Sequence, residues 1–224
     1  FLSHLANQNG VKVILTGDGA DELYCGYNRW MMYSKNKKYF DYLNSYPNFI
    51  KSGAFCTSNL LAKNHPLNEM LFRAKNNLEY FWGGSGGIKE SNKRTILNKK
   101  YFDNIEENSS DKIIKKIREN FLKFKSAKDL TFIDWMCFFG LNHIVPNYYL
   151  YRADKIGMAN SIEIRTPFLD HNFVSMSMNV PSKFKVKNSI PKYILKKTFE
   201  KDLPKEILFR QKQGFCVPLF DWSN

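Results

Sequence analysis

Three carboxylates lie within five residues of a glycine-rich segment in this 224-residue chain, at Asp18, Asp21 and Glu22. Gly17 and Gly19 flank the first of them, and glycine lets backbone N–H groups approach a ligand closely. Carboxylates beside bound phosphate usually hold Mg²⁺, because this ion prefers oxygen ligands and keeps some of its own waters. Asp21 and Glu22 would also stabilise a helix N-terminus without any ligand. The segment alone leaves both interpretations open.

Lys192 is the second candidate for chemistry. Ser189 and Pro191 mark the start of a helix, which places Lys192 in its first turn. A cation there opposes the helix dipole, whereas a bound anion would be attracted by both the ammonium and the helix N-terminus. The alternative is a lysine that points into water, as an equal of Lys196 and Lys197.

Two further segments have the composition of phosphate-binding loops. Arg210 and Lys212 flank Gln211 before Gly214 and Phe215, and this basic turn would either contact phosphate or close the fold. Residues 83–87 read Gly-Gly-Ser-Gly-Gly. No strand precedes them and no Gly-Lys-Ser/Thr follows, so they lack the context of a P-loop. We therefore predict a flexible loop at 83–87.

A strand, a turn and a helix must position the carboxylates. The apolar, β-branched run at 11–15 is typical of a buried parallel strand. Residues 16–19 form a turn, a helix begins at Ala20, and an aromatic-rich helix continues over 23–33. In open α/β sheets such a junction lies at the carboxyl ends of the strands, where ligands bind. A preceding helix over 1–8 is closed by the Asn-Gly pair that follows it.

The rest of the chain is predicted to be mainly helical. Hydrophobic periodicity predicts helices over 67–82, 111–124, 130–141 and 147–153. Pro146 suits the first turn of the last of these. Glu163 and Arg165 face the same side of an extended segment, which predicts a buried salt bridge that braces the loop. Asp170 suits the N-cap of a helix that reaches Met178.

Composition describes a globular protein, with 43% apolar residues, 16% aromatic residues and a net charge of +13. Such a charge would suit nucleic acid. No recognised nucleic-acid-binding motif accompanies it, so we favour solvated lysines. No apolar run approaches the ~20 residues that a membrane span needs. The N-terminus lacks a signal peptide and an initiator Met, so we expect the chain to begin inside a larger protein.

Cysteine usage indicates a reducing compartment. The four cysteines are widely spaced and form no C-x-x-C pair; they are Cys25, Cys56, Cys137 and Cys216. This pattern fits reduced thiols better than a disulfide framework or a zinc site. We expect a soluble, cytoplasmic protein that does not bind a membrane.

Three segments in order resemble the asparagine synthetase family. Residues 15–29, LTGDGADELYCGYNR, are similar to its Leu-Ser/Thr-Gly-Glu/Asp-Gly-x-Asp-Glu-x-Phe-x-Gly-Tyr turn. Residues 152–171, RADKIGMANSIEIRTPFLDH, resemble its Asp-Arg-x-x-Met-x-x-Ser-x-Glu-x-Arg-x-Pro-Phe-Leu-Asp-His block. Residues 191–222 resemble its closing segment, from Lys-x-x-Leu-Arg through Arg-x-Lys-x-Gly-Phe to a final Pro and Trp. The middle of the chain, 35–141, matches weakly.

The resemblance implies an α/β fold in which helices greatly outnumber strands. Its parallel sheet would be of the adenine-nucleotide alpha-hydrolase type, truncated because the first strands are missing. The family uses ATP to adenylate a carboxylate, which is aspartate in asparagine synthesis, and releases pyrophosphate. Ammonia, made from glutamine by a separate N-terminal glutaminase domain, then attacks the activated carbonyl to give an amide.

The resemblance also implies roles for individual residues. Nucleotide contacts would come from Thr16, Gly17, Gly19 and Lys192. Asp18 would act near the acyl-adenylate and the incoming ammonia, and Asp21 would bind Mg²⁺ with support from Glu22. Lys192 would neutralise charge on the leaving pyrophosphate, which is electrostatic stabilisation of the transition state.

Three departures from the family pattern limit these expectations. Asp18 is one methylene shorter than the Glu of many asparagine synthetases. The Ser-Gly-Gly-x-Asp-Ser pyrophosphate loop and the glutaminase domain are absent from residues 1–224. We therefore expect one partial synthetase domain that is inactive alone. The alternatives are amidation of a sugar carboxylate in surface-polysaccharide synthesis, and a non-catalytic basic binding module.

Overall fold

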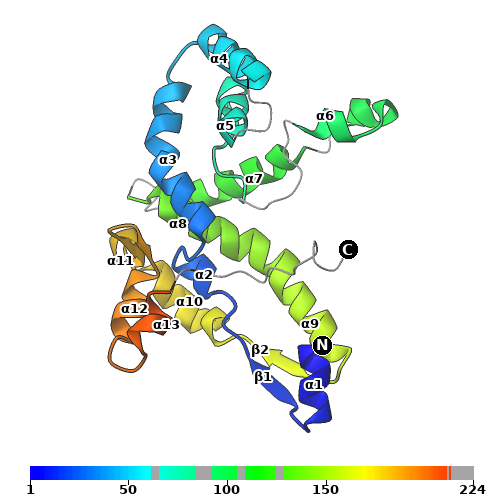
Figure 1. Ribbon diagram of the computed structural model, residues 1–224, viewed down its shortest axis with the longest axis vertical. Coiled ribbons are helices and arrows are strands. Elements are labelled where there is room, and N and C mark those ends of the chain that lie inside the picture. Colours follow the sequence, from blue (N-terminus) through cyan, green and yellow to red (C-terminus); the bar gives the residue numbers. More distant parts are fainter. Residues whose placement is uncertain (62–65, 84–91, 105–108, 125–128, 211, 213–224) are drawn as a thin grey trace.

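Helices dominate the chain in our computed structural model, which describes residues 1–61, 66–83, 92–104, 109–124, 129–210 and 212 (Figure 1). The strands form two small sheets, and they are β1 (Val13–Leu15), β2 (Glu163–Arg165), β3 (Val186–Lys187) and β4 (Ile190–Pro191). The helices of the first half are α1 (Leu2–Gln8), α2 (Ala20–Leu23), α3 (Asn28–Asn44), α4 (Asn48–Leu61), α5 (Pro66–Lys75), α6 (Lys93–Ile96), η2 (Lys99–Asn104) and α7 (Ser110–Leu122). Those of the second half are α8 (Phe132–Phe139), η3 (Gly140–Leu150), α9 (Tyr151–Met158), η4 (Pro167–Leu169), α10 (His171–Met178), α11 (Ser182–Lys185), α12 (Tyr193–Thr198) and α13 (Lys205–Leu208).

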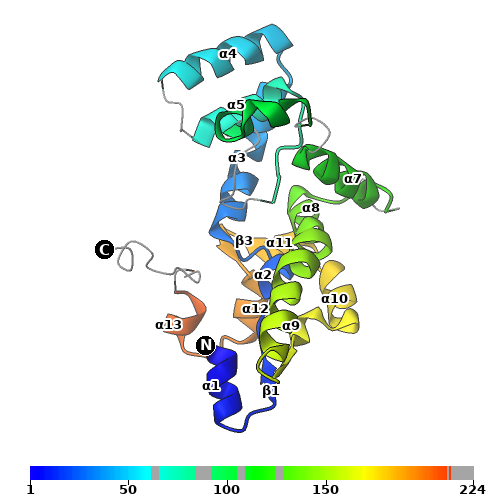
Figure 2. The same ribbon diagram turned by 90° about the vertical axis from the view of Figure 1, so that its right-hand side faces the viewer.

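A long helical rod joins two parts of the molecule. Figure 1 shows α8, η3 and α9 running continuously from the helices α3–α7 to the end that holds α1, β1 and β2. The short helix α2 contacts α8, η3 and α10. Figure 2 shows α12 beside α2, and the N–H of Lys192 before α12 donates to the carbonyl of Tyr24 after α2. The acidic segment is thus held near the centre of the molecule.

An aromatic core supports α2 from one side. Trp30 of α3 packs edge-on against Phe81, with ring centroids 5.4 Å apart, and Phe81 packs in the same way against Phe139 of α8. Trp135 also lies fully buried in this cluster. Edge-to-face packing of this kind is favourable beyond the apolar area that it buries. The expectation of a buried helix over 130–141 is confirmed.

Strand β1 is a parallel strand, as the sequence predicts, and its partner is β2, a pairing that the sequence did not predict. Val13 pairs with Glu163 and Leu15 with Arg165. The expectation of a buried strand is wrong, because Val13 is 39% and Leu15 is 68% exposed. Within the described residues β1 pairs with β2 alone, and a strand with a single neighbour leaves apolar side chains uncovered.

Two predicted helices are interrupted by residues with positive φ. The helix expected over 23–33 is broken between α2 and α3, where Cys25 has φ +54°. The helix expected over 67–82 ends with α5, because Asn77 has φ +51° and the N–H of Leu78 donates to the carbonyl of Arg73 (2.8 Å). That bond and the left-handed residue before it form a Schellman motif, which the Asn76-Asn77 pair signals weakly.

Pro146 does not begin a helix as predicted. It lies inside η3, a π-helix that continues α8 into α9. An α-helix would lose a backbone hydrogen bond at proline and suffer a clash with the preceding turn. The wider π-helical turn accommodates the ring, and π-helical segments are a recognised way of placing a special residue inside a helix.

Residues 163–170 of the block 152–171 are extended and then turn, as expected. Arg165 Nε donates to Glu163 Oε1 (2.8 Å), but both side chains are more than half exposed. The prediction of a buried salt bridge there is therefore wrong, since these side chains point away from the core. Asp170 accepts from the N–H groups of Asn172 and Phe173, which confirms its predicted N-cap role.

Other expectations concern the surface of the molecule. The helix α1 is closed at Asn9 and Gly10, as predicted. Of the predicted 83–87 loop, Gly83 has φ +92° and the other residues lie outside the described part. Cys25 and Cys137 are buried free thiols and Cys56 is an exposed one. No helix among the described residues is long and apolar enough to cross a membrane.

Candidate functional site

The turn after β1 is fixed to the second sequence block. The N–H of Thr16 donates to the carbonyl of Arg165 (2.9 Å), which extends the β1–β2 ladder by one residue. Gly19 has φ +93°, and a Cβ built there would lie 2.3 Å from Leu169 Cδ2. Any other residue would meet both strain and a clash at this position. The glycine therefore lets the turn lie directly on η4.

Asp18 and Gly17 occupy the outer side of the turn. The hydroxyl of Thr16 donates to Asp18 Oδ2 (2.8 Å), which fixes the direction of that carboxylate. A Cβ built on Gly17 would have no neighbour within 4 Å. The turn thus presents open backbone beside an oriented carboxylate.

Asp21 is held between two lysines that are distant in sequence. Lys192 Nζ lies 2.8 Å from Asp21 Oδ1, and Lys212 Nζ lies 2.8 Å from Asp21 Oδ2. The side chain of Asp21 is 16% exposed, and those of the two lysines are 25% and 38% exposed. Burial alone would raise the pKa of Asp21, but the attraction of Lys192 and Lys212 outweighs it and lowers that pKa. Asp21 is therefore a stable anion at neutral pH.

A β-hairpin places Lys192, and the sequence analysis did not predict it. Asn188 and Ser189 both have positive φ and join β3 to β4, as a type I′ hairpin turn requires. Lys192 follows as the N-cap of α12 in a left-handed conformation, with φ +54°. It is thus one residue before the helical turn expected for it. Its N–H donates to the carbonyl of Tyr24 (3.1 Å), so the backbone itself is registered against α2.

Gly26 gives the ion pair its space. Its N–H donates to the carbonyl of Asp21 (2.8 Å). A Cβ at Gly26 would lie 1.9 Å from Asp21 Oδ1 and 2.2 Å from Lys192 Cε. These separations are far below van der Waals contact, so the contact between Asp21 and Lys192 depends on the absence of a side chain at Gly26.

Gly26→Ala is therefore expected to separate Lys192 from Asp21. The new methyl group overlaps both Asp21 Oδ1 and Lys192 Cε, so the two side chains must move apart and the pKa of Asp21 rises towards its ordinary value. Overpacking of this kind also costs about 1–3 kcal/mol of stability. Carboxyl ¹³C NMR titration of Asp21 measures the first effect. Gly53→Ala is the control, because a Cβ at Gly53 meets nothing within 4 Å. An unchanged Asp21 pKa in a folded Gly26→Ala protein would contradict this account of the pair.

Glu22 points the opposite way, into the core. It is 1% exposed, and the Tyr27 hydroxyl donates to Glu22 Oε1. The hydroxyl of Tyr149 lies 3.1 Å from that of Tyr27. Burial raises the pKa of Glu22, although the hydrogen bond from Tyr27 opposes the rise. A Cβ on Gly140 would lie 2.9 Å from Glu22 Cγ, so η3 packs directly behind α2.

The structure brings together some of the candidate residues and separates others. Asp21 and Lys192 are in direct contact, Asp18 lies at the preceding turn, and Glu22 is enclosed behind Asp21. Within the described ranges, no three or more His, Cys, Asp or Glu side chains gather as a metal cluster. Mg²⁺ bound to a phosphorylated ligand commonly has only one or two protein carboxylates, and Asp21 alone, ionised and partly exposed, meets that requirement.

The contacts of two further residues with Asp21 are not predicted from the sequence. The residues around Lys212 do not distinguish a phosphate contact from closure of the fold, because nothing local indicates that Lys212 reaches Asp21. Gly26 lies in the segment 15–29, but a glycine between a cysteine and a tyrosine carries no signal of a close approach. Its position in the resembling motif was the available signal.

Comparison with known proteins places these residues in a family context. The profile of the asparagine synthase family matches residues 1–224. Asparagine synthetase [glutamine-hydrolyzing] 1 of Bacillus subtilis is 29% identical over 212 residues, covering 95% of this chain and 32% of the relative. The putative asparagine synthetase [glutamine-hydrolyzing] of Mycobacterium tuberculosis is 28% identical over 224 residues, covering 95% of this chain and 30% of the relative.

A shorter match has higher identity. Asparagine synthetase [glutamine-hydrolyzing] of Homo sapiens is 45% identical over 76 residues, covering 33% of this chain and 14% of the relative. No solved structure matches the chain significantly. The chain thus spans about a third of the length of the curated relatives that match nearly all of it.

Proposed function

The chain belongs to the asparagine synthase family, and we propose that it is part of an ATP-dependent, AMP-forming amidotransferase. The enzyme adenylates a carboxylate, aspartate in the first instance, and transfers ammonia from glutamine to give asparagine. The observation that carries the proposal is the group formed by Asp21, Lys192 and Lys212 at the carboxyl end of β1. It combines one anion for a metal with two cations for phosphate, at the place where α/β sheets bind ligands.

The residues of the turn are proposed to bind the nucleotide. Thr16, Gly17 and Gly19 are proposed to contact it through the backbone, since the turn is open at Gly17. Asp18, directed by Thr16, faces the activated carbonyl and the incoming ammonia. An ionised carboxylate there favours the positive charge that develops on the attacking nitrogen, and it can accept a proton from it.

Lys192 is proposed to stabilise the negative charge that develops on the leaving group. As the bond between the α-phosphorus and the bridging oxygen breaks, negative charge gathers on pyrophosphate, and a fixed ammonium stabilises it. The ammonium lies 2.8 Å from Asp21 Oδ1. This ion pair keeps the lysine at the site, so less side-chain freedom is lost when phosphate binds.

Asp21 is the proposed protein ligand for Mg²⁺, with Glu22 in support. When bound, the ion would neutralise charge on the phosphate oxygens. Glu22 is buried and hydrogen-bonded to Tyr27, so it holds α2 in place behind Asp21. Both carboxylate oxygens of Asp21 contact lysines, and binding of a metal nucleotide would therefore transfer these ammonium groups to phosphate.

The remaining parts of the domain are proposed to lie elsewhere in a longer protein. Its relatives are about three times as long, and β1 leaves Val13 and Leu15 exposed with an unpaired edge in the described structure. We propose that upstream strands complete a sheet of the adenine-nucleotide alpha-hydrolase type and carry the pyrophosphate loop. A glutaminase domain would precede them. The exposed free thiol Cys56 favours a cytoplasmic enzyme.

Pyrophosphate exchange tests this function. Residues 1–224 alone are expected to show no ATP–pyrophosphate exchange above background, because the pyrophosphate loop is missing. The longer natural protein is expected to exchange only when a carboxylate substrate is added. Parallel exchange assays with aspartate and with uronic acids distinguish asparagine formation from amidation of a sugar carboxylate. Robust exchange by residues 1–224, or exchange by the longer protein that needs no carboxylate, would contradict the proposal.

A further inference from the structure

A cavity of about 570 Å³ lies beside α3 and α5. Residues of α3, of α5 and of the segment 80–82 line it, and none of Asp18, Asp21 and Lys192 does so. Small-molecule sites are concave, of roughly 300–1,000 Å³, and mostly apolar with a few convergent polar groups. The cavity has this size and this kind of lining.

One face of α3 forms the first wall. Arg29, Met32, Tyr33, Asn36 and Tyr39 line the cavity, and their spacing of three and four residues puts them on one side of a helix. The opposite wall consists of Leu67 and Met70 of α5, with Tyr80 and Trp82 beyond the end of that helix. Four of the side chains are aromatic, which favours a flat ligand that can stack or pack edge-on.

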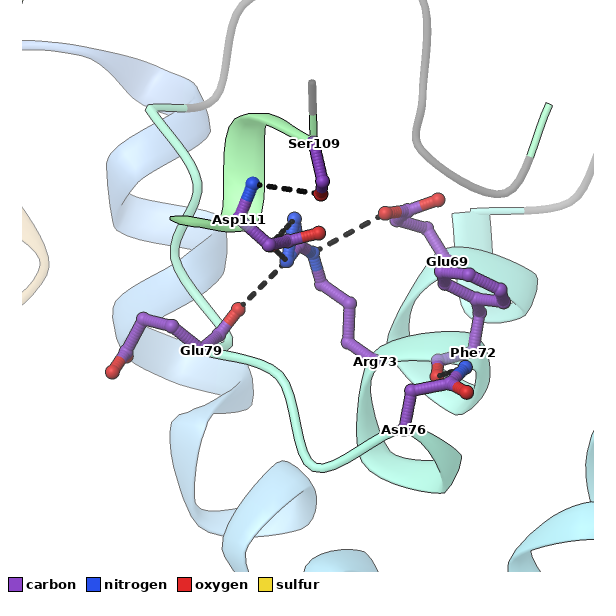
Figure 3. Close-up of polar contacts among 7 residues, drawn as sticks. All are labelled: Glu69, Phe72, Arg73, Asn76, Glu79, Ser109 and Asp111. Carbon is purple, nitrogen blue, oxygen red and sulfur yellow. Dashed lines mark hydrogen bonds and ion pairs between the residues drawn. The ribbon is translucent and has the colours of Figure 1, made fainter. Parts of the chain in front are cut away.

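The floor of the cavity is Arg73, whose guanidinium forms ion pairs with two carboxylates. Figure 3 shows the guanidinium of Arg73 surrounded by Glu69, Asp111 and the carbonyl of Glu79. Arg73 is 1% exposed, and its guanidinium carbon lies 5.6 Å from the centre of the Trp82 ring. Two carboxylates compensate this cation, so Arg73 fixes the shape of the floor and is not available to a ligand.

Arg29 differs from Arg73 in having no such compensation. Its guanidinium carbon lies 6.0 Å from the centre of the same Trp82 ring, and its side chain is exposed. In the described part of the chain no carboxylate pairs with it. Burial raises the pKa of Tyr33, while the positive charges of Arg29 and Arg73 oppose that rise. Both cations therefore lie near the Tyr33 hydroxyl, and Tyr33 lines the cavity.

We infer that this cavity is a binding site for a small aromatic carboxylate, separate from the synthetase site. The aromatic body would lie between Tyr33, Tyr80 and Trp82. The carboxylate would accept hydrogen bonds from two N–H groups of Arg29. The planar guanidinium matches the geometry of a carboxylate, and no carboxylate among the described residues pairs with it.

Calorimetric titration of the 224-residue chain tests the inference with 2-naphthoate and its neutral analogue 2-naphthalenemethanol. Saturable binding of 2-naphthoate is expected, with weaker binding of the alcohol. Arg29→Met keeps the apolar stem and removes the charge. It should weaken the binding of 2-naphthoate at least about tenfold and leave the affinity for the alcohol unchanged, since charge-assisted hydrogen bonds are stronger than neutral ones.

Two more variants keep the test decisive. Met32→Trp fills the mouth of the cavity and should abolish binding of both compounds. Lys35→Met removes an exposed cation from the same helix without touching the cavity and should change neither. Absence of saturable binding, or binding that survives Met32→Trp, overturns the inference. Circular dichroism confirms that each variant is folded.

The outcome is separable from that of the proposed synthetase function. Lys192→Ala leaves the cavity intact, so 2-naphthoate should bind this variant as it binds the unmodified chain. Loss of binding on Lys192→Ala would assign 2-naphthoate to the Asp21 site and overturn the cavity. Failure of pyrophosphate exchange in the longer protein would leave the calorimetric result unaffected.

Discussion

Lys192→Ala is expected to lower the rate of ATP–pyrophosphate exchange by about 10²–10³-fold in the proposed full-length enzyme, which is the typical cost of losing one transition-state donor. The KM for ATP should change much less. Charge on the phosphates is already partly neutralised in the ground state, but it grows on the leaving pyrophosphate, where the ammonium interacts most strongly. An interaction that strengthens in the transition state acts on kcat. Initial rates of exchange across a range of ATP concentrations measure both quantities.

The neighbouring lysines and a conservative variant of Lys192 provide the controls. Lys197 is exposed and pairs with Glu200, so Lys197→Ala should leave exchange close to the unmodified rate. Lys196 is a less clean control, because burial and the charge of Lys192 both lower its pKa. Lys192→Arg should rescue only partly, since a planar fork does not replace a compact point charge. Normal exchange by Lys192→Ala, with loss of exchange by Lys197→Ala, would show that the lysine was misassigned.

Local signals predicted the elements that hold the acidic segment. The strand, the turn at Gly17 and Gly19 and the start of α2 follow from β-branched residues, glycine and first-turn carboxylates. The N-cap role of Asp170 was equally readable, because a short polar side chain before an apolar run caps a helix. In each case the physical cause lies within about five residues of its effect.

Features that depend on contacts between distant residues could not be predicted from local sequence signals. The contact of Lys192 and Lys212 with Asp21 joins residues more than 170 positions apart. Only the resemblance of three blocks to one family indicated that Asp21 and Lys192 share a site. The exposure of Leu15 depends on which chain segments cover the sheet, and the apolar run itself carries no such information.

Backbone conformations that override propensity were the other source of error. The breaks at Cys25 and Asn77 use non-glycine residues with positive φ, which surrounding contacts stabilise. Pro146 lies within a π-helix, which sequence periodicity does not distinguish from an α-helix followed by a new start. The cavity between α3 and α5 depends on the second of these breaks, because a continuous helix over 67–82 would not bring Tyr80 and Trp82 to it.

Arg73→Met is expected to destabilise the chain by about 3–5 kcal/mol, as the removal of one partner from a buried ion pair does. Glu69 and Asp111 are 8% and 11% exposed as side chains and both contact this guanidinium. The substitution leaves two poorly solvated carboxylates without their cation, and it removes the hydrogen bond to the Glu79 carbonyl (3.0 Å). In a chain of this size the melting temperature would fall by roughly 6–20 °C.

The matched control is the same substitution at an exposed pair. Arg165 contacts Glu163 at 2.8 Å, which is comparable to the 2.7 Å between Arg73 and Asp111. The side chains of Arg165 and Glu163, however, are both more than half exposed. Water replaces the lost cation there, so Arg165→Met should leave the melting temperature unchanged within error. Thermal unfolding followed by circular dichroism compares the two variants directly. Equal effects would mean that the surroundings of Arg73 are as well solvated as the surface, and that Arg73 does not form the rigid floor of the cavity.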